Sequence, residues 1–472
     1  MSNEVEEHRE YQRAALNARL PGEVAVLNAT TAAMAVRQQE RLRRLVAHAK
    51  SRSPWHRHRL GAIDASTVTV ADLARIPVMT KSDLMEHWDG IVTDRSLTLT
   101  GANRHLADLA DDEAPSHLPG GHVVAATGGT TGLRAVVAWD RDGLVDGVLG
   151  AMRTFAWLTQ RGVLQPEATP VRAQFGATSR VHISAVIGRI FAPSSNIAFF
   201  GPDRDIDDIV AELNELRPAN VAGYPSLLHR VAMRALDGPL RIAPSRIGAQ
   251  AEPLLPETRA ALEAAFGKVV INIYGATEAL NIATSHPAHD GLHLNEDINI
   301  VEPVDASGAP AAAAERSASI LVTNLVNLVM PLIRYQITDE VELREGRCGC
   351  PHPGRWTGDV GGRLDDWFTY GSIDVHPHTF RTVLAGHPAV VEYQVRQIPN
   401  GAEVSIDTAG AAVDVAAIRD AVAAKLEHAG LRAPRVIVLD GGPVQRHGET
   451  GKLKRFVPLD RAVGDTAAGR LQ

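Results

Sequence analysis

The stretch VVINIYGATE, residues 269–278, indicates how this chain is built. Every residue from Val269 to Ile273 except one asparagine is apolar and β-branched, which is typical of a strand buried in a sheet. The strand runs directly into Tyr274-Gly275, and Glu278 follows in the turn. Because α/β proteins collect functional loops at the ends of such strands, the segment predicts a buried strand with polar residues placed at its end.

Helical segments alternate with short β-rich runs between about residues 120 and 340. Ile206–Leu216 carries its apolar residues on one side. Pro256–Phe266 is followed by Gly267, a residue type that commonly ends a helix. A further helix is expected over Thr30–Lys50. This alternation predicts an α/β fold, with a large N-terminal α/β domain of mixed sheets flanked by helices.

The composition changes after about residue 362. Strands are expected at Val390–Val395, Glu403–Ile406 and Val436–Leu439, with a helix between the last two. The pattern predicts a small mobile α+β domain at the C-terminus. We place the boundary in the glycine- and aspartate-rich stretch Gly361–Asp366, whose composition suits a hinge. The expected domains are residues 1–362 and 363–472.

Bulk properties exclude several classes of protein. The chain has 472 residues, 45% of them hydrophobic, and a net charge of −7 with scattered basic residues, so no nucleic-acid partner is expected. No apolar run is long enough to span a bilayer, which argues against a membrane partner. The N-terminal residues 1–7 are acidic and polar, unlike a secretory signal. We therefore expect a cytoplasmic protein.

A glycine- and threonine-rich loop, Thr127–Gly132, lies between two apolar runs. Glycines let successive backbone N–H groups turn inward, and threonine hydroxyls add donors, so such a loop can cradle phosphate oxygens. A simple hairpin turn explains the same residues. Glu278 is similarly open to two interpretations, as a Mg²⁺ ligand or as a carboxylate that caps the turn.

Taken in order, these segments resemble the adenylate-forming superfamily, most closely its phenylacetate–coenzyme A ligase-like branch. The resemblance covers nearly the whole chain and rests on a series of short motifs. These are Ser53–Arg57, Ile76–Lys81, Thr127–Gly132, Gly223–Ser226, Ala251–Leu254, Tyr274–Glu278, Pro331–Tyr335 with Asp339, Gly362–Asp366 and Gly451-Lys452.

The resemblance implies a nucleotide-binding role for residues from several of these motifs. The loop that would hold the β- and γ-phosphates of ATP consists of Thr127, Gly128, Gly129, Thr130 and Thr131. The residues that would frame the adenine and shape the adjoining turn are Ala251, Glu252, Pro253, Tyr274, Gly275 and Thr277. Asp339 would accept hydrogen bonds from the ribose hydroxyls.

The same resemblance implies three catalytic side chains. Glu278 would contact Mg²⁺, and Arg363 would lie near the ribose. Lys452 would reach from the small domain to the α-phosphate and the substrate carboxylate, a role that suits a compact ammonium group. Asp365 matches the family's hinge position. The alternatives are that Asp339 is an ordinary loop aspartate and Lys452 a solvated surface charge.

Two departures from the family pattern bear on function. The phosphate loop usually continues Gly-Lys-Pro, but here Gly132 is followed by Leu133-Arg134, and Arg134 could take the place of the lysine. Gly371–Val375 stands where the channel for the second substrate is expected. These departures weaken the prediction of the second half-reaction more than that of the first.

The chain's two cysteines, Cys348 and Cys350, suggest a zinc site. Zinc binds four thiolate or imidazole ligands tetrahedrally, and members of this branch can carry a structural zinc in the corresponding loops. We expect His286 and His293 to complete the set, with His289 as a competing ligand. Free thiols beside surface histidines are the alternative.

The sequence thus predicts an enzyme that uses ATP and Mg²⁺ to activate an aromatic or similar small carboxylic acid as acyl-AMP and then transfers the acyl group to coenzyme A. A second hypothesis keeps adenylation but changes the acceptor to an amine or a carrier protein, or has the enzyme activate an inorganic oxyanion such as nitrite. A third is a non-catalytic nucleotide-binding descendant of the fold. Phe175–His182 and Tyr224 are expected to contribute to the substrate pocket. A homodimer is one of the oligomeric states that the sequence leaves open.

Overall fold

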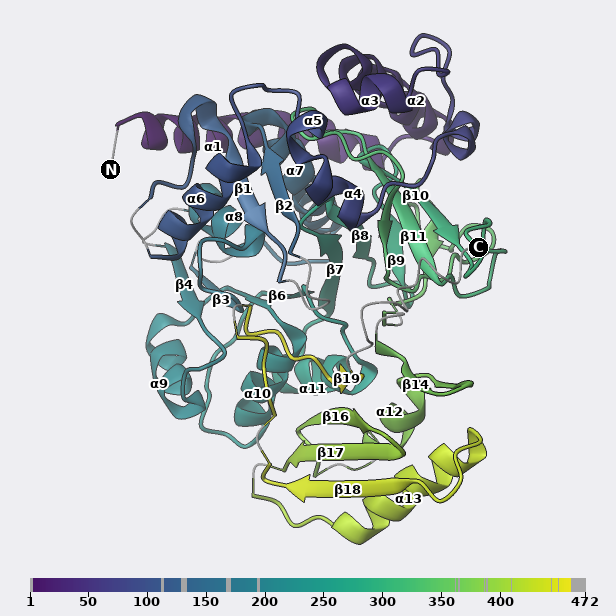
Figure 1. Cartoon of the computed structure of the whole chain (residues 1–472). Helices are drawn as coiled ribbons and strands as arrows, with labels where there is room; N and C mark the ends of the chain where they lie inside the picture. Colours follow the sequence, from purple (N-terminus) through teal and green to yellow (C-terminus); the bar gives the residue numbers. More distant parts are fainter. Residues whose placement is uncertain are drawn as a thin grey trace.

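The computed structural model (Figure 1) describes residues 3–111, 114–128, 134–166, 171–192, 196–360, 362–363, 366–385, 387, 389–408, 410–442, 444–448 and 450–459. Within these ranges, no helix combines the length and the apolar character that crossing a membrane would need. The helices are α1 (Asn3–Leu27), α2 (Thr31–Arg52), α3 (Pro54–Arg59), α4 (Lys81–Glu86), α5 (Trp88–Ile91), α6 (Leu99–Ala110), α7 (Arg141–Gln160), α8 (Ile183–Phe191), α9 (Ile206–Leu216), α10 (Pro225–Leu236), α11 (Pro256–Phe266), α12 (His378–Leu384) and α13 (Val415–His428), with 3-10 turns η1 (Val70–Arg75) and η2 (Pro119–Gly121).

An eight-stranded mixed sheet forms the centre of the large N-terminal part, in the order β13-β9-β8-β7-β6-β5-β3-β4. Its strands are β3 (Arg172–Phe175), β4 (Ile197–Phe200), β5 (Asn220–Gly223), β6 (Arg246–Gln250), β7 (Val270–Ala276), β8 (Leu280–Ser285), β9 (Leu292–Leu294) and β13 (Trp356–Thr357). The strands from β4 to β7 pair in parallel, and the strands from β7 to β13 pair antiparallel. The strand that the sequence predicted at residues 269–273 is therefore β7, at the point where the sheet changes from parallel to antiparallel.

Strand β7 is covered on both faces, which explains why its residues are apolar except for Asn272. Val270 belongs to a hydrophobic cluster with residues of α9, α10 and α11, such as Leu228 and Leu262. Ile271, which points to the opposite face, packs in a second cluster with Leu27 of α1 and Trp157 of α7. The sheet thus lies between two layers of helices, and the α/β fold expected from the sequence is confirmed.

Helix α7 carries three glycines at close contacts: Gly147 and Gly150 face strand β8, and Gly143 faces the segment that follows Asn324. A Cβ at Gly147 would overlap the side chain of Leu280 in β8, and a Cβ at Gly143 would lie 2.9 Å from a backbone carbonyl oxygen. Although glycine destabilises a helix interior, here it permits a close contact between helix and strand that any larger residue would prevent.

Two smaller sheets complete the N-terminal part. Strands β1 (Val123–Ala126) and β2 (Val136–Trp139) form an antiparallel hairpin that is buried along its length. Strands β10 (Asn299–Val304), β11 (Ser319–Asn324) and β12 (Tyr335–Ile337) form an antiparallel sheet. The predicted phosphate loop connects β1 to β2, and β12 leads to Asp339.

The remaining strands belong to a C-terminal α+β subdomain, which Figure 1 shows below the large sheet. They are β14 (Phe368–Tyr370), β15 (Ile373–Val375), β16 (Glu392–Ile398), β17 (Gly401–Asp407), β18 (Arg435–Asp440) and β19 (Phe456–Val457), the last four forming a sheet in the order β18-β17-β16-β19. Its core includes Phe368, Phe380 and Val404. The connection between β18 and β19, yellow in Figure 1, rises from this subdomain toward the large sheet.

A buried ionic cluster joins the first helices to the rest of the N-terminal part. Arg153 of α7 donates hydrogen bonds of 2.6 and 2.9 Å to the two carboxylate oxygens of Asp297 and one of 3.2 Å to Glu23 of α1. Arg37 and Arg41 of α2 also lie within ion-pair distance of Asp297. Burial alone would raise the pKa of Asp297, but the surrounding arginines hold it well below its usual range.

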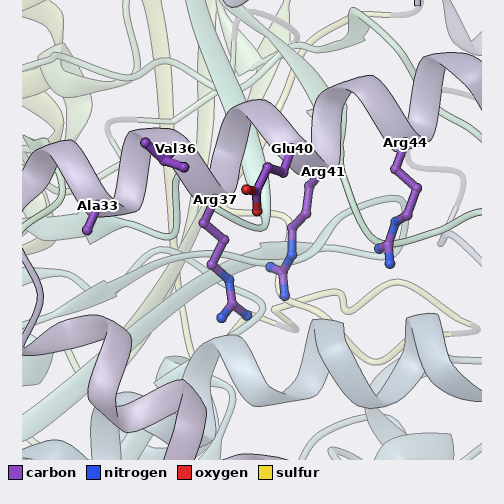
Figure 2. Close-up of a pocket in the computed structure, with 6 residues that line it drawn as sticks. All are labelled: Ala33, Val36, Arg37, Glu40, Arg41 and Arg44. Carbon is purple, nitrogen blue, oxygen red and sulfur yellow. The ribbon is translucent and has the colours of Figure 1, made fainter. Parts of the chain in front are cut away.

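A cavity of about 510 Å³ lies along α2 beside this cluster (Figure 2). Its arginines, Arg37, Arg41 and Arg44, point to the same side of the helix. Because Arg37 and Arg41 already pair with Glu23 and Asp297, two of the three charges have a structural explanation. None of the residues predicted to bind nucleotide or metal lines this cavity.

Replacing Asp297 with alanine should destabilise the protein strongly, because it leaves the buried Arg153 without its main partner. We expect a loss of about 3–5 kcal/mol in the free energy of unfolding, measured by urea denaturation. The contribution of Asp297 is present above about pH 3.9, the pKa of an unfolded aspartate, and is lost as the pH falls through the lower folded-state pKa.

The matched control is Asp420→Ala, which removes an exposed ion pair with Arg419 and should leave stability nearly unchanged. Equal effects of the two substitutions would contradict the structural role assigned to the buried cluster.

Candidate active site

The end of β7 carries a hydrogen-bonded group of three predicted residues. Tyr274 Oη donates to Asp339 Oδ2 over 2.9 Å, and Arg363 Nε donates to Asp339 Oδ1 over 2.8 Å. Burial, and then the neighbouring Asp339, raises the pKa of Tyr274 well above its ordinary value, so the phenol stays protonated and continues to donate. Asp339 is only 5% exposed. Residues from three distant segments therefore meet at one carboxylate.

Glu278 lies beside this group in the turn after β7. Tyr335 of β12 donates a 3.1 Å hydrogen bond to Glu278 Oε1, and the glutamate is 7% exposed. Burial, and then Glu278, raises the pKa of Tyr335. The group of metal-ligating side chains found in the described part of the chain does not include Glu278. As a single carboxylate it suits Mg²⁺, which takes its other oxygen ligands from water and substrate phosphates.

The predicted phosphate loop begins at the end of β1. Thr127 Oγ1 accepts a 2.9 Å hydrogen bond from the Ala135 N–H, and Thr127 N donates to Ala135 O, so the two sides of the loop are joined at its base. Gly129, Thr130 and Thr131 lie outside the described residues, as do Gly361, Leu364 and Asp365 of the predicted hinge. For all of these, the assigned roles stay predictions.

The C-terminal subdomain inserts a short loop, Thr450–Lys452, into the N-terminal part. Tyr224 Oη donates a 3.1 Å hydrogen bond to Thr450 O. A Cβ at Gly128 would overlap the side chain of Thr450, and a Cβ at Gly451 would overlap Pro202. The close approach of this loop to the predicted phosphate loop therefore depends on glycine at position 128, and its approach to Pro202 depends on glycine at position 451.

Lys452 occupies the position where the polar residues of both parts converge. Its Nζ lies 5.9 Å from the centre of the Tyr224 ring. Burial, and then the positive charge of Arg363, lowers the pKa of Lys452 to about 8, against the influence of the carboxylates of Glu252, Asp339 and Glu278. Lys452 is half-buried and lies in the electrostatic environment of this group, while its catalytic role stays a prediction.

The Ala251–Pro253 segment follows β6 and also faces the inserted loop. Glu252 Oε2 accepts a hydrogen bond from Ser226 N over 3.1 Å, and Glu252 Oε1 accepts one from Leu453 N over 2.8 Å. Ala251 has a left-handed backbone with φ of 69°. The carboxylate of Glu252 thus points to the C-terminal loop, while contact of this segment with adenine stays a prediction.

Gly275 and Thr277, the two other residues predicted to shape the turn after β7, have packing contacts. A Cβ at Gly275 would overlap the carbonyl of Leu280, where β7 and β8 are irregularly paired. Thr277 O accepts a 3.3 Å hydrogen bond from the Trp139 indole N–H. These contacts fix the shape of the turn that presents Glu278.

A second cluster, of metal-ligating residues, lies at the edge of the large sheet formed by β9 and β13. The ligand atoms of His289, His293, Cys348 and Cys350 all lie within 4.8 Å of one another. Cys350 Sγ is 3.1 Å and Cys348 Sγ is 3.3 Å from His293 Nε2. Two imidazoles and two thiols are a donor set that suits tetrahedral zinc, and the buried His293 and Cys350 suit a structural position.

The cluster contains His289, the competing ligand named from the sequence, and not His286. His289 Nε2 is 3.1 Å from His293 Nε2. The ring of His286 instead stacks on that of His289, with its Nδ1 accepting a hydrogen bond from Ala288 N. One turn of a loop separates the two histidines, so sequence spacing could not distinguish them.

The orientation of the two ligand histidines supports metal binding. His293 Nδ1 lies 3.0 Å from Gly354 O, and His289 Nδ1 lies 3.2 Å from Asp290 O. If each Nδ1 carries its proton and donates to the carbonyl, each Nε2 is left with a lone pair that faces the cysteines. Ligand histidines are usually held in this way.

Other residues near the site were missed or take a structural part. Arg180, considered for the substrate pocket, donates a 2.7 Å hydrogen bond to Ala114 O, and His182 Nδ1 lies 3.3 Å from Ala126 O. Neither Tyr335 nor Arg446 received a role from the sequence. Arg446 donates to Ser226 Oγ over 2.9 Å across the boundary between the two parts, a contact for which the sequence offers no signal.

Comparisons with known proteins agree with this architecture. No family model matches the chain. The phenylacetate-coenzyme A ligase of Thermus thermophilus is 24% identical over 467 residues, covering 89% of this chain and 96% of that protein. The enzyme of the same name from Pseudomonas putida is 24% identical over 372 residues, covering 74% of this chain and 75% of that protein.

Solved structures give the same result for the fold. The crystal structure of 2-hydroxyisobutyryl-CoA ligase in the postadenylation state matches with a TM-score of 0.65 at 16% identity, covering 90% of this chain and 89% of that one. The same ligase in the thioesterification state matches with a TM-score of 0.53 over 90% of both chains.

The chain has the fold of the adenylate-forming superfamily. Over most of its length it is a distant homologue of the phenylacetate–coenzyme A ligases. The family resemblance expected from the motifs is confirmed.

Proposed function

We propose that this protein activates a small carboxylic acid with ATP to form an acyl-AMP and then transfers the acyl group to coenzyme A. The observation that carries the proposal is the position of Lys452. It reaches from the C-terminal subdomain to a site that contains Asp339, Arg363 and Glu278, and it shares their electrostatic environment. A solvated lysine without a catalytic role would not be expected to lie near Asp339, Arg363 and Glu278.

Adenylation brings together two anions, the carboxylate of the acid and the α-phosphate of ATP. The carboxylate oxygen forms a bond to the α-phosphorus while the bond to pyrophosphate breaks. The Lys452 ammonium would offset the charge that develops at this centre. Asp339 would hold the ribose, with Tyr274 and Arg363 fixing the orientation of its carboxylate. Mg²⁺, held through Glu278, would neutralise charge on the phosphates.

The second step is proposed from the relatives. The ligases to which this chain is similar are named coenzyme A ligases, which supports coenzyme A as the acceptor. Phenylacetate, the acid in two of these names, supports an aromatic acid as the substrate. Gly371–Val375, the stretch that departs from the family pattern, lies in the β14–β15 hairpin, with Gly371 at φ of 62° in its turn. Because this departure concerns the second substrate, an amine or a carrier protein as acceptor, or activation of an inorganic oxyanion such as nitrite, remains the alternative.

We infer that His289, His293, Cys348 and Cys350 hold a structural zinc ion. The donor set and the two histidine orientations support this inference. The ion would connect β9, which carries His293 just beyond the loop of His289, to the loop that precedes β13. Four protein ligands leave no open position for water, which suits a structural rather than a catalytic ion.

The first prediction concerns Lys452. Wild-type protein should catalyse ATP–pyrophosphate exchange that depends on Mg²⁺ and on one acid from a panel of aryl and aliphatic carboxylates. Lys452→Ala should slow this exchange by about 100-fold or more, because the charge acts on the transition state. Lys454→Ala, which removes a nearby lysine, is the matched control and should retain activity. Exchange that is unchanged in Lys452→Ala would remove the lysine from the mechanism.

Adenylation should also weaken at alkaline pH. With a pKa of about 8, Lys452 is charged below this pH and loses its charge as the pH rises through it. The kcat/KM for ATP, which reports the free enzyme, should therefore fall above about pH 8. Lys452→Arg should lose this alkaline limb, because arginine stays charged. An alkaline limb that persists in Lys452→Arg would assign it to another group.

Protein purified without added zinc should contain about one zinc ion per chain by elemental analysis. Cys350→Ser and His289→Ala should lower both the zinc content and the melting temperature, because the ligands that remain bind the ion less well. His286→Ala should leave the zinc content unchanged. A zinc content near zero in intact, folded wild-type protein would refute the site.

A further inference from the structure

Glu252 connects the two parts of the molecule through a single carboxylate. Oε2 accepts a hydrogen bond from Ser226 N in the large N-terminal part, and Oε1 accepts one from Leu453 N in the C-terminal subdomain. The two N–H groups lie 227 positions apart in the sequence (453 minus 226). Because Leu453 directly follows Lys452, a bond to its backbone also restrains the position of the lysine.

The N-terminal part holds Glu252 in place. Ser226 is the second residue of α10, and the first N–H groups of a helix have no partner within the helix itself. A carboxylate at this position satisfies one of them and is favoured by the helix dipole. The aromatic side chain of Tyr224, which precedes the helix, donates instead to Thr450 O. Glu252 is therefore oriented by α10 before it meets the C-terminal loop.

Further contacts bring the loop to the same place. Arg446 donates to Ser226 Oγ over 2.9 Å, to Gly451 O over 3.2 Å and to Glu392 over 2.7 Å. Arg446 and the Thr450–Leu453 loop thus both contact the region at the start of α10. Glu252 accepts a hydrogen bond from each of the two parts there. Any rotation of the subdomain that withdraws Lys452 from the site also separates Leu453 from Glu252.

We propose that Glu252 is a positioning residue for adenylation, which holds Lys452 in the site by binding the backbone N–H of Leu453. The proposal rests on the function proposed above. Each oxygen of the carboxylate already accepts one of these hydrogen bonds, and the bond to Leu453 links Glu252 to the lysine. The kinetic test below separates this role from a contact with the nucleotide base. The bond belongs to the arrangement in which Lys452 reaches Asp339 and Arg363, and it is absent from any arrangement that moves the loop away.

Two substitutions test this role. Glu252→Gln keeps the shape but places an NH₂ group against one of the two N–H donors, and Glu252→Ala removes both acceptors. The matched control is Glu257→Gln. Glu257 also pairs across the boundary, with Arg381 of α12 over 3.4 Å, but it does not contact the lysine loop.

The kinetic test separates the two half-reactions. We expect both Glu252 variants to lower the kcat of acid-dependent ATP–pyrophosphate exchange by roughly 10- to 100-fold, the cost of a misplaced catalytic group, with little change in the KM for ATP. Thioester formation from supplied acyl-AMP and coenzyme A should stay near the wild-type rate, and Glu257→Gln should resemble wild type in both assays. A raised KM for ATP with unchanged kcat would instead indicate an adenine contact and overturn the proposal, as would equal losses in both half-reactions.

A second measurement does not depend on activity. Hydrogen–deuterium exchange of the ligand-free protein should be faster in the Thr450–Leu453 segment of both Glu252 variants than in wild type, because the Leu453 N–H loses its acceptor. Exchange in the buried strand β7 should be unchanged, which shows that the variants are folded. Wild-type protection of this segment in the variants would overturn the proposal. If wild type shows no acid-dependent exchange of pyrophosphate, the proposed function fails, while the deuterium experiment still decides whether Glu252 holds the loop.

Discussion

The structure depends on one electrostatic constraint. Lys452 of the C-terminal subdomain lies in the electrostatic environment of two buried carboxylates, Asp339 and Glu278, of the N-terminal part. Removing an ammonium group from water is costly unless opposite charges surround it. Asp339 and Glu278 supply such charges, and Tyr274 and Tyr335 hold them by hydrogen bonds. The N-terminal part thus positions the carboxylates, and the C-terminal subdomain contributes the lysine.

The layered fold serves this constraint. Strand β7 lies where the pairing in the sheet changes from parallel to antiparallel. Tyr274 near its end and Glu278 in the turn that follows lie beside the residues of and after β12. Helices α9 and α11 begin and end at the residues predicted from their apolar spacing and flanking glycine, because these signals are local. Helix α1 contains Pro21 and helix α7 contains three glycines. Neither was predicted, because α1 is stabilised by packing on α7 and α8 and α7 by packing on β8, which local propensity does not describe.

The site was predictable to a similar degree. The motifs named Tyr274, Asp339 and Arg363, and the fold brings these three together. Two features could not be read from the sequence. The loop path brings His289, and not His286, into the cluster of His293 and the two cysteines, and Glu252 turns toward Leu453 because of how two separate parts of the chain meet. Both depend on contacts across long sequence separations, whereas motifs report only which residue types stand near one another in the chain.

The glycines at the meeting of the two parts have a further consequence. Gly128 and Gly451 face Thr450 and Pro202 so closely that backbone alone fits between them. This crowding exists only when the parts are together. Gly451 also has a positive φ of 62°, which favours glycine in its own turn, whereas Gly128 is crowded only by Thr450 from the other part. Melting temperature would therefore not report on Gly128, and a library ranked by it would retain bulky residues there that leave a well-folded but inactive protein.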